Sequence, residues 1–146
     1  MKTFLAALIF VATVIASSAA ETAAASPVSP SVAKDSICYE MRTYVAAPGK
    51  FEALNARFRD HTCALFKKHG MEIVGFWIPA DAGKGADNTL VYILAHKSRE
   101  AAKKSWAAFG ADPAWKKAFS ESEVNGKLTT KVESLFLSAT DYSPMK

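Results

Sequence analysis

The sequence is short of the residues and motifs that usually identify a reaction. It has three histidines, and their spacing matches no zinc, haem-attachment or carboxylate-triad pattern. It contains no G-x-S-x-G, no P-loop and no dinucleotide-binding glycine fingerprint. We therefore expect no metal and no cofactor, and nucleotide chemistry has no support in the sequence.

Long apolar runs are also lacking. Residues 4–16 are apolar and follow Lys2, but this run is shorter than the roughly 20 residues that cross a bilayer. Small residues come next, and Ser18 and Ala20 suit the −3 and −1 positions of a signal-peptidase site. We expect residues 1–20 to be a signal peptide, with an uncleaved anchor as the alternative. The protein is then exported, to the periplasm or outside the cell, without stable membrane insertion after cleavage.

Large apolar side chains are nearly absent from residues 21–35, which are rich in Ala, Ser, Thr and Pro. Such a segment cannot bury enough apolar surface to offset its chain entropy, so it is predicted to be a disordered linker. The folded domain is expected at residues 36–146, which is long enough for one modest core.

Positive charge is not concentrated anywhere, and cysteine is scarce. The formal net charge is +4, and the lysines are scattered at positions expected on solvated helix faces. A nucleic-acid-binding protein gathers positive charge in one patch among exposed aromatics, so no nucleic-acid partner is expected. In an oxidising compartment Cys38 and Cys63 could form a disulfide; two free, small apolar side chains are the alternative.

The residues that are present predict an α+β fold. Strands are predicted at 37–45, 71–79, 89–96 and 131–139, where β-branched and aromatic residues are enriched. A helix is predicted at 50–69, with Leu54 and Phe58 on its buried apolar stripe. A second is predicted after a serine cap at position 98, and a short one opened by Asp-Pro at 112–113. The order β-α-β-β-α-β is typical of the ferredoxin-like arrangement, a four-stranded antiparallel sheet with its helices on one face.

The other face of such a sheet needs a cover. Several residues expected to point there are large and apolar, and a bare face would leave an exposed patch of the kind that marks an interface. We therefore expect two copies to pack sheet against sheet as a homodimeric α/β barrel.

The first strand supplies the main candidate ligand-binding residues. The odd-numbered residues of 37–45 match apolar helix faces better, so Glu40, Arg42 and Tyr44 are predicted to point into the space between the sheets. Glu40 would be an acid/base or an anchor, Arg42 a clamp for an anionic or carbonyl oxygen, and Tyr44 a donor. The alternative is a purely structural ion pair that fixes register.

Further candidates lie on the later strands. Trp77 and Tyr92 lie on the two middle strands, where at least one could line an apolar cavity. His96 ends the third strand and is the histidine best placed for a cavity rim. Haem handling is a weaker variant that would use His61 or His96 as the axial ligand.

Three long segments resemble the NIPSNAP family: YEMRTY at 39–44, PGKFEALNARFRDHTCALFKKHGMEIVGFW at 48–77, and NTLVYILAHKSREAAKKSWAAFGADPAWKKAF at 88–119. The resemblance covers about residue 37 to the end and implies the dimeric α/β-barrel version of the ferredoxin-like fold. The resemblance assigns no catalytic residues to this chain, because NIPSNAP-type domains have no agreed set of catalytic residues. The mitochondrial members of the family have an Arg-rich transit peptide, whereas this chain has an expected export signal. This difference fits a bacterial exported protein better.

Three functions are open at this point. The leading one is an exported homodimer that binds a small, partly apolar ligand between the sheets. The second is a cofactor-independent enzyme, similar to the monooxygenases among dimeric α/β barrels or to an isomerase. The third is a purely structural or protein-interaction dimer.

Overall fold

A computed structural model describes residues 28–145 of the chain. The predicted signal peptide and the first part of the predicted linker lie outside these residues. In chain order the elements are β1 (Cys38–Ala46), α1 (Phe51–Arg57), η1 (Phe58–Thr62), α2 (Cys63–Lys68), β2 (Glu72–Trp77), β3 (Thr89–His96), α3 (Arg99–Ala111), α4 (Pro113–Ser122) and β4 (Thr129–Ser138).

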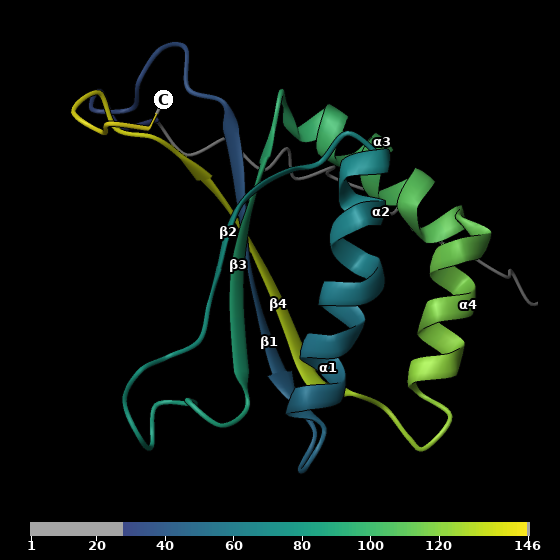
Figure 1. Ribbon diagram of the computed structural model, residues 1–146. Coiled ribbons are helices and arrows are strands. Elements are labelled where there is room, and N and C mark those ends of the chain that lie inside the picture. The colour runs from purple at the N-terminus through teal and green to yellow at the C-terminus, as the bar shows by residue number, and fades with distance from the viewer. Residues whose placement is uncertain (1–27, 146) are drawn as a thin grey trace, which may run out of the picture.

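The strands form one antiparallel sheet in the order β2-β3-β1-β4. All the helices lie on the same face of this sheet, and the other face carries none (Figure 1). The predicted α+β, ferredoxin-like fold is therefore confirmed.

Local sequence signals explain where the helices begin and end. The side chain of Ser98 accepts a hydrogen bond from the backbone amide of Ala101 at 3.1 Å and caps α3. Asp112 caps α4 in the same way, with Pro113 in the first turn. Gly70 follows α2 with a φ of 71°, a backbone conformation that favours glycine.

The first helical segment differs from a single continuous helix. Its middle, η1, is a five-residue π-helical turn between α1 and α2. A π-turn holds one more residue than an α-turn, so it changes which residues face the sheet. Leu54 and Phe58 are buried as predicted, and Arg57 and Phe66 join them on the buried face.

The side chains of β1 point to the opposite faces of the sheet from those predicted. Tyr44 packs against Phe58 of η1 with ring centroids 5.6 Å apart, and Glu40 bonds Trp106 of α3. The even-numbered residues of β1 therefore face the helices. The prediction that Glu40, Arg42 and Tyr44 point between two sheets is wrong, because the helix layer supplies the donors and aromatic faces that satisfy these polar side chains.

The two ends of the described chain meet beside the sheet. Val32 and Thr140 form an isolated antiparallel bridge, and the amide of Asp141 donates to the carbonyl of Ser31 at 2.8 Å. Hydrogen-bonded structure therefore begins a few residues before the predicted domain boundary at Ser36.

Two further observations concern the described residues as a whole. Within residues 28–145, none of the helices has the length and apolar character needed to span a bilayer. Cys38 and Cys63 are both free in this structure, which is the second of the two alternatives that the sequence left open.

Candidate functional site

The carboxylate of Glu40 is the centre of a hydrogen-bond network between the sheet and α3. Its Oε1 accepts from Arg42 Nη1 at 2.8 Å and from Ser134 Oγ at 2.7 Å. Its Oε2 accepts from Trp106 Nε1 at 2.6 Å and lies 3.2 Å from His96 Nε2. Because these partners come from β1, β4, α3 and β3, one side chain ties four elements together.

The same contacts determine the ionisation of Glu40, which is only 2 % exposed. Burial opposes the charged form, but hydrogen bonds from His96, Ser134 and Trp106 and the charge of Arg42 outweigh it and lower the pKa to about 2. Glu40 is therefore fully ionised at neutral pH. Of the two predicted roles, acid/base and anchor, the geometry favours the anchor.

Arg42 is held by Glu40 and by an aromatic face. Its guanidinium carbon lies 4.3 Å from the ring centroid of Trp106 and 5.8 Å from that of Tyr44. Its Nε is buried and has no hydrogen-bond partner among residues 28–145. The guanidinium is thus held on two sides, and its buried Nε donor is left without a protein partner among these residues.

Next to Arg42 lies a cavity of about 120 Å³ between the sheet and the helices. Most of its lining is aromatic, and Tyr44 and Trp106, which flank Arg42, belong to it. Phe119 of α4 and Val132 of β4 also line it and are 43 % and 45 % exposed, so the cavity opens between α4 and β4. The other aromatic lining residues are Phe58, Phe66, Phe109 and Trp115.

Arg57 lines the same cavity and is a functional candidate that the sequence analysis missed. Its Nη1 donates to Glu123 Oε1 at 3.2 Å and to Ser122 Oγ at 3.3 Å. Its Nε, like that of Arg42, is buried without a partner among residues 28–145. The signal that could have found it is its spacing, because Arg57 follows the buried Leu54 by three residues in α1 and so shares its face.

The remaining predicted site residues are divided between the two faces of the sheet. Tyr92 is fully buried on the helix side and donates to Tyr44 Oη at 3.2 Å. Burial raises the pKa of Tyr92 well above 10, so the donor keeps its proton. His96 is buried beside Glu40, whereas Trp77 is on the open face. The structure therefore brings together Glu40, Arg42, Tyr44, Tyr92 and His96, but not Trp77.

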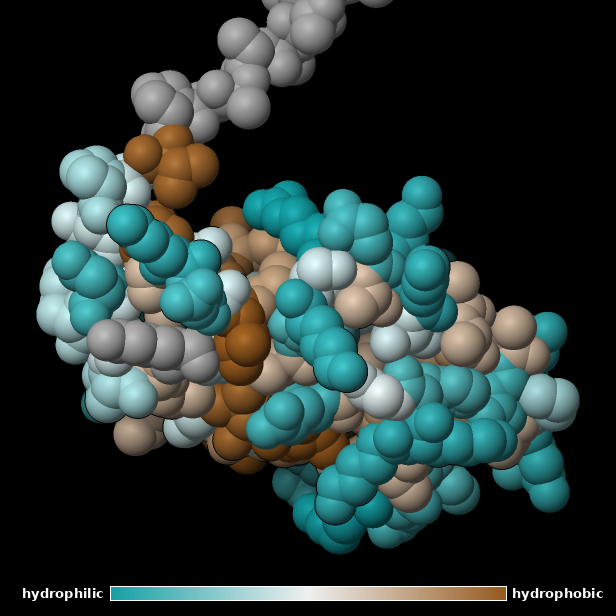
Figure 2. Space-filling view, turned by 90° about the horizontal axis from the view of Figure 1, so that it is seen from above, coloured by the Kyte–Doolittle hydropathy of each residue, from teal (hydrophilic) through white to brown (hydrophobic). Residues whose placement is uncertain are grey.

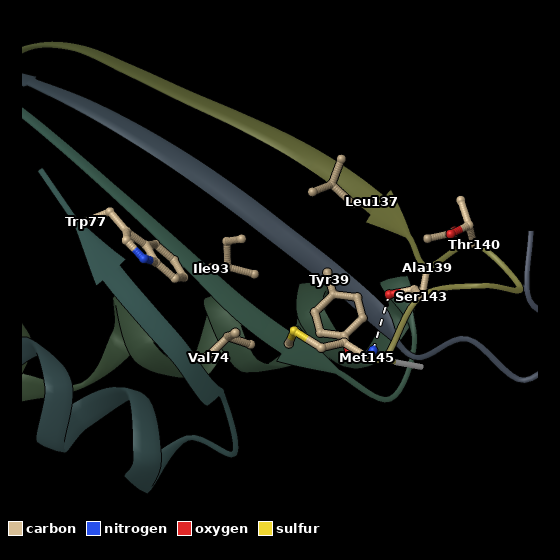
Figure 3. Close-up of a pocket in the computed structure, with 10 residues that line it drawn as sticks. Tyr39, Val74, Trp77, Ile93, Leu137, Ala139, Thr140, Ser143 and Met145 are labelled. Atoms are coloured by element: carbon tan, nitrogen blue, oxygen red, sulfur yellow. Dashed lines mark hydrogen bonds between the residues drawn. The ribbon is translucent and has the colours of Figure 1, made fainter. Parts of the chain in front are cut away.

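The open face carries a larger hollow, of about 380 Å³, whose lining residues have no charge. Figure 3 shows Trp77, Ile93, Tyr39 and Leu137 across the strands, with Met145 of the C-terminal segment beside them. Seen from above, apolar surface gathers toward the sheet side, and polar side chains dominate over the helices (Figure 2). This face is apolar over a wide area and holds no polar cluster comparable to that around Glu40.

Metal-binding geometry is not found in the part of the chain that the structure describes. Within residues 28–145, no three His, Cys, Asp or Glu side chains are grouped so as to hold a metal ion. His61 is exposed and lines a groove between α1 and α4, and it does not line the aromatic cavity, which is on the other side of Arg57.

Comparisons with known proteins agree with this fold. A family model described as NIPSNAP matches residues 39–144. A NIPSNAP family protein of unknown function from Agrobacterium tumefaciens has a TM-score of 0.67 and 24 % identity, over 79 % of this chain and 98 % of that chain. An uncharacterized NIPSNAP-like domain protein from Burkholderia xenovorans has a TM-score of 0.63 and 18 % identity, over 74 % of this chain and 89 % of that one.

A more distant structure is a putative antibiotic biosynthesis monooxygenase from Nitrosomonas europaea. Its TM-score is 0.50 at 14 % identity, over 70 % of this chain and 97 % of that one. Such a likeness shows the fold alone and says nothing of the reaction. No curated protein matches this chain.

Proposed function

The chain belongs to the NIPSNAP family, and we propose that it is an exported homodimeric α/β-barrel protein that binds a small, partly apolar ligand. The ligand site is the cavity between the helices and the sheet. One observation carries this proposal: the aromatic cavity of about 120 Å³ is lined by Arg57, whose buried Nε has no partner among residues 28–145.

The size and lining of the cavity limit the ligand. An apolar protein cavity of about 150 Å³ admits benzene, so a cavity of about 120 Å³ suits a short branched chain, or a single ring that projects partly through the mouth. Buried polar groups in proteins almost always have a partner. Binding sites commonly combine an apolar wall with a few polar groups that orient the ligand. A ligand oxygen that accepts from Arg42 or Arg57 would complete this pattern.

Binding fits the site better than acid–base catalysis does. A general base works best when its pKa is near the operating pH, whereas Glu40 has a pKa of about 2 and accepts bonds on both oxygens. Glu40 therefore acts on Arg42, whose guanidinium it holds against Trp106.

The ligand site can be tested with a neutral single-ring probe, 4-fluorobenzamide, followed by ¹⁹F NMR on the purified protein. We expect saturable binding that is lost in Val132→Trp, where the larger side chain fills the mouth of the cavity. Val124→Trp is the matched control, because Val124 is exposed and does not line the cavity. Absence of saturable binding to the unmodified protein, or unchanged binding to Val132→Trp, would refute the site.

The homodimer is supported by the open face of the sheet. Trp77 and Leu135, on strands at opposite edges, are 48 % and 53 % exposed, and monomeric proteins rarely leave such a patch uncovered. A second copy that packs by a two-fold axis would cover both edges at once.

Light scattering coupled to size-exclusion chromatography tests the dimer. We expect Leu135→Glu to give a monomer, because a buried carboxylate in an apolar interface has no partner. Val124→Glu should remain a dimer. A monomeric unmodified protein would contradict the proposal directly.

Export is tested separately, by the mass of the protein recovered from the cells that produce it. Cleavage after Ala20 leaves a chain that begins at Glu21, outside the cytoplasm. A full-length chain in the cytoplasm would contradict export but would not bear on the proposed ligand site.

A further inference from the structure

We propose that the ligand of the helix-side cavity carries a carboxylate, which Arg57 binds through the Nε–Nη2 edge of its guanidinium. This inference rests on the proposed function, because it names the chemical class that the same cavity takes. The ligand is then a small monocarboxylate whose apolar body is a single ring or a short branched chain.

The bonds that Arg57 already makes leave one edge of its guanidinium free. Both recorded bonds, to Glu123 and Ser122, use Nη1, and the buried Nε has no partner among residues 28–145. The side chain is almost fully buried and lines the cavity. In a planar guanidinium Nε and Nη2 point in parallel on the side away from Nη1, and this pair matches the two oxygens of a carboxylate.

Aromatic rings fix the plane of this guanidinium. Its central carbon lies 5.4 Å from the ring centroid of Trp115 and 5.3 Å from that of Phe119, and both rings line the cavity. Arg57 therefore meets the aromatic wall at one end of the cavity. A ligand would place its carboxylate there and its apolar body against the rings.

Arg57 ends α1, three residues after the buried Leu54, and the next residue begins the π-helical turn η1. Thr62 ends this turn, and its buried hydroxyl donates a hydrogen bond to the carbonyl oxygen of Arg57 at 3.1 Å. Such turns are frequent at functional sites because they re-aim one residue of a helix. Thr62 is thus a positioning residue for Arg57.

Glu123 has two opposed effects on binding. Its Oε1 holds Nη1 and also accepts from the amide of Leu128 at 3.3 Å, so it fixes the position of Arg57. Its negative charge also repels an incoming carboxylate. A glutamine at this position keeps an acceptor oxygen and removes the charge, which should make anion binding tighter.

The test compares two probes of nearly equal shape, 4-fluorobenzoate and 4-fluorobenzamide, by ¹⁹F NMR at neutral pH. The unmodified protein should bind the benzoate at least tenfold more tightly than the benzamide. Arg57→Met should bring this ratio close to one and leave benzamide affinity within about twofold. Arg59→Met is the matched control, since Arg59 is in the same turn but exposed, and it should keep the ratio.

Two further variants keep the test informative if Arg57→Met does not fold. Glu123→Gln should tighten benzoate binding at least threefold without changing benzamide binding. Thr62→Val, which loses the hydroxyl, should lower the benzoate preference at least threefold.

Each adverse result has a separate meaning. Equal affinity for both probes, a preference that survives Arg57→Met, or an unchanged preference in Glu123→Gln would overturn the carboxylate inference alone. An unchanged preference in Thr62→Val would overturn the positioning role of Thr62. Failure of both probes to bind would overturn the proposed function as well.

Discussion

Replacing Glu40 by glutamine should destabilise the protein in a way that depends on pH. Glutamine has nearly the same shape, but it has no charge and only one acceptor oxygen for the four partners of the carboxylate. The pKa of Glu40 is about 2 in the folded protein against 4.5 ordinarily. At about 1.4 kcal/mol per pKa unit, this difference corresponds to a stabilisation of about 3 kcal/mol at neutral pH.

The direction of the pH dependence follows from the lowered pKa. A carboxylate whose folded pKa lies below its unfolded pKa stabilises the protein at every pH above the unfolded value. For Glu40 this stabilisation is complete above about pH 5 and is lost as the pH falls from 4.5 toward 2. The difference in unfolding free energy between the unmodified protein and Glu40→Gln should therefore shrink over this range.

Urea denaturation followed by circular dichroism at pH 7, 5, 4 and 3, at one protein concentration, measures this difference. Asp112 also has a lowered pKa, but it titrates in both proteins and cancels in the comparison. The control is Glu121→Gln, an exposed carboxylate on α4 paired with Lys117, which should change stability by less than about 0.5 kcal/mol. A Glu40→Gln difference below about 1 kcal/mol at pH 7, or one that does not change with pH, would refute the reasoning.

Three smaller predictions concern other contacts. Trp106→Phe removes a donor to Glu40 and should reduce unfolding free energy by about 2 kcal/mol in the same urea assay; an unchanged midpoint would contradict this. Asp112→Asn keeps the cap of α4 but loses the negative charge, and it should lower the melting temperature by roughly 4 °C in scanning calorimetry. An unchanged melting temperature would mean that this charge does not stabilise the protein. Gly75→Ala should displace the indole of Trp77, since an added Cβ would lie 2.9 Å from it; dimer dissociation measured by sedimentation should then increase, and unchanged affinity would place Trp77 outside the interface.

The element order could be predicted from the sequence because its signals are local. Enrichment in β-branched and aromatic residues predicted the strands, and the caps at Ser98 and Asp112 placed the starts of two helices correctly. The stripe at Leu54 and Phe58 was predicted as buried and is buried. These signals depend only on neighbours a few residues apart, so they do not require knowledge of the packing.

The site was not predictable to the same degree because it depends on contacts across long sequence distances. Which face of β1 meets the helices is decided by partners such as Trp106 and Ser134, 66 and 94 residues from Glu40. Apolar content alone favoured the odd-numbered register, and this choice was wrong. The buried position of Arg57 follows from the ordinary helical period, three residues after Leu54, but its partner Glu123 lies 66 residues away in the sequence and was not predicted.

The arrangement of the two arginines argues that the charges beside the cavity are more than structural. Buried ion pairs can often be replaced by apolar side chains with little loss of stability, so an ion pair alone is weak evidence for a function. Arg42 and Arg57, however, each bind a glutamate through Nη1 and each leave a buried Nε without a partner among residues 28–145. An unsatisfied buried donor is destabilising by about 1–3 kcal/mol. For Arg57, which lines the aromatic cavity, such a donor is most simply explained if a bound oxygen acceptor completes it.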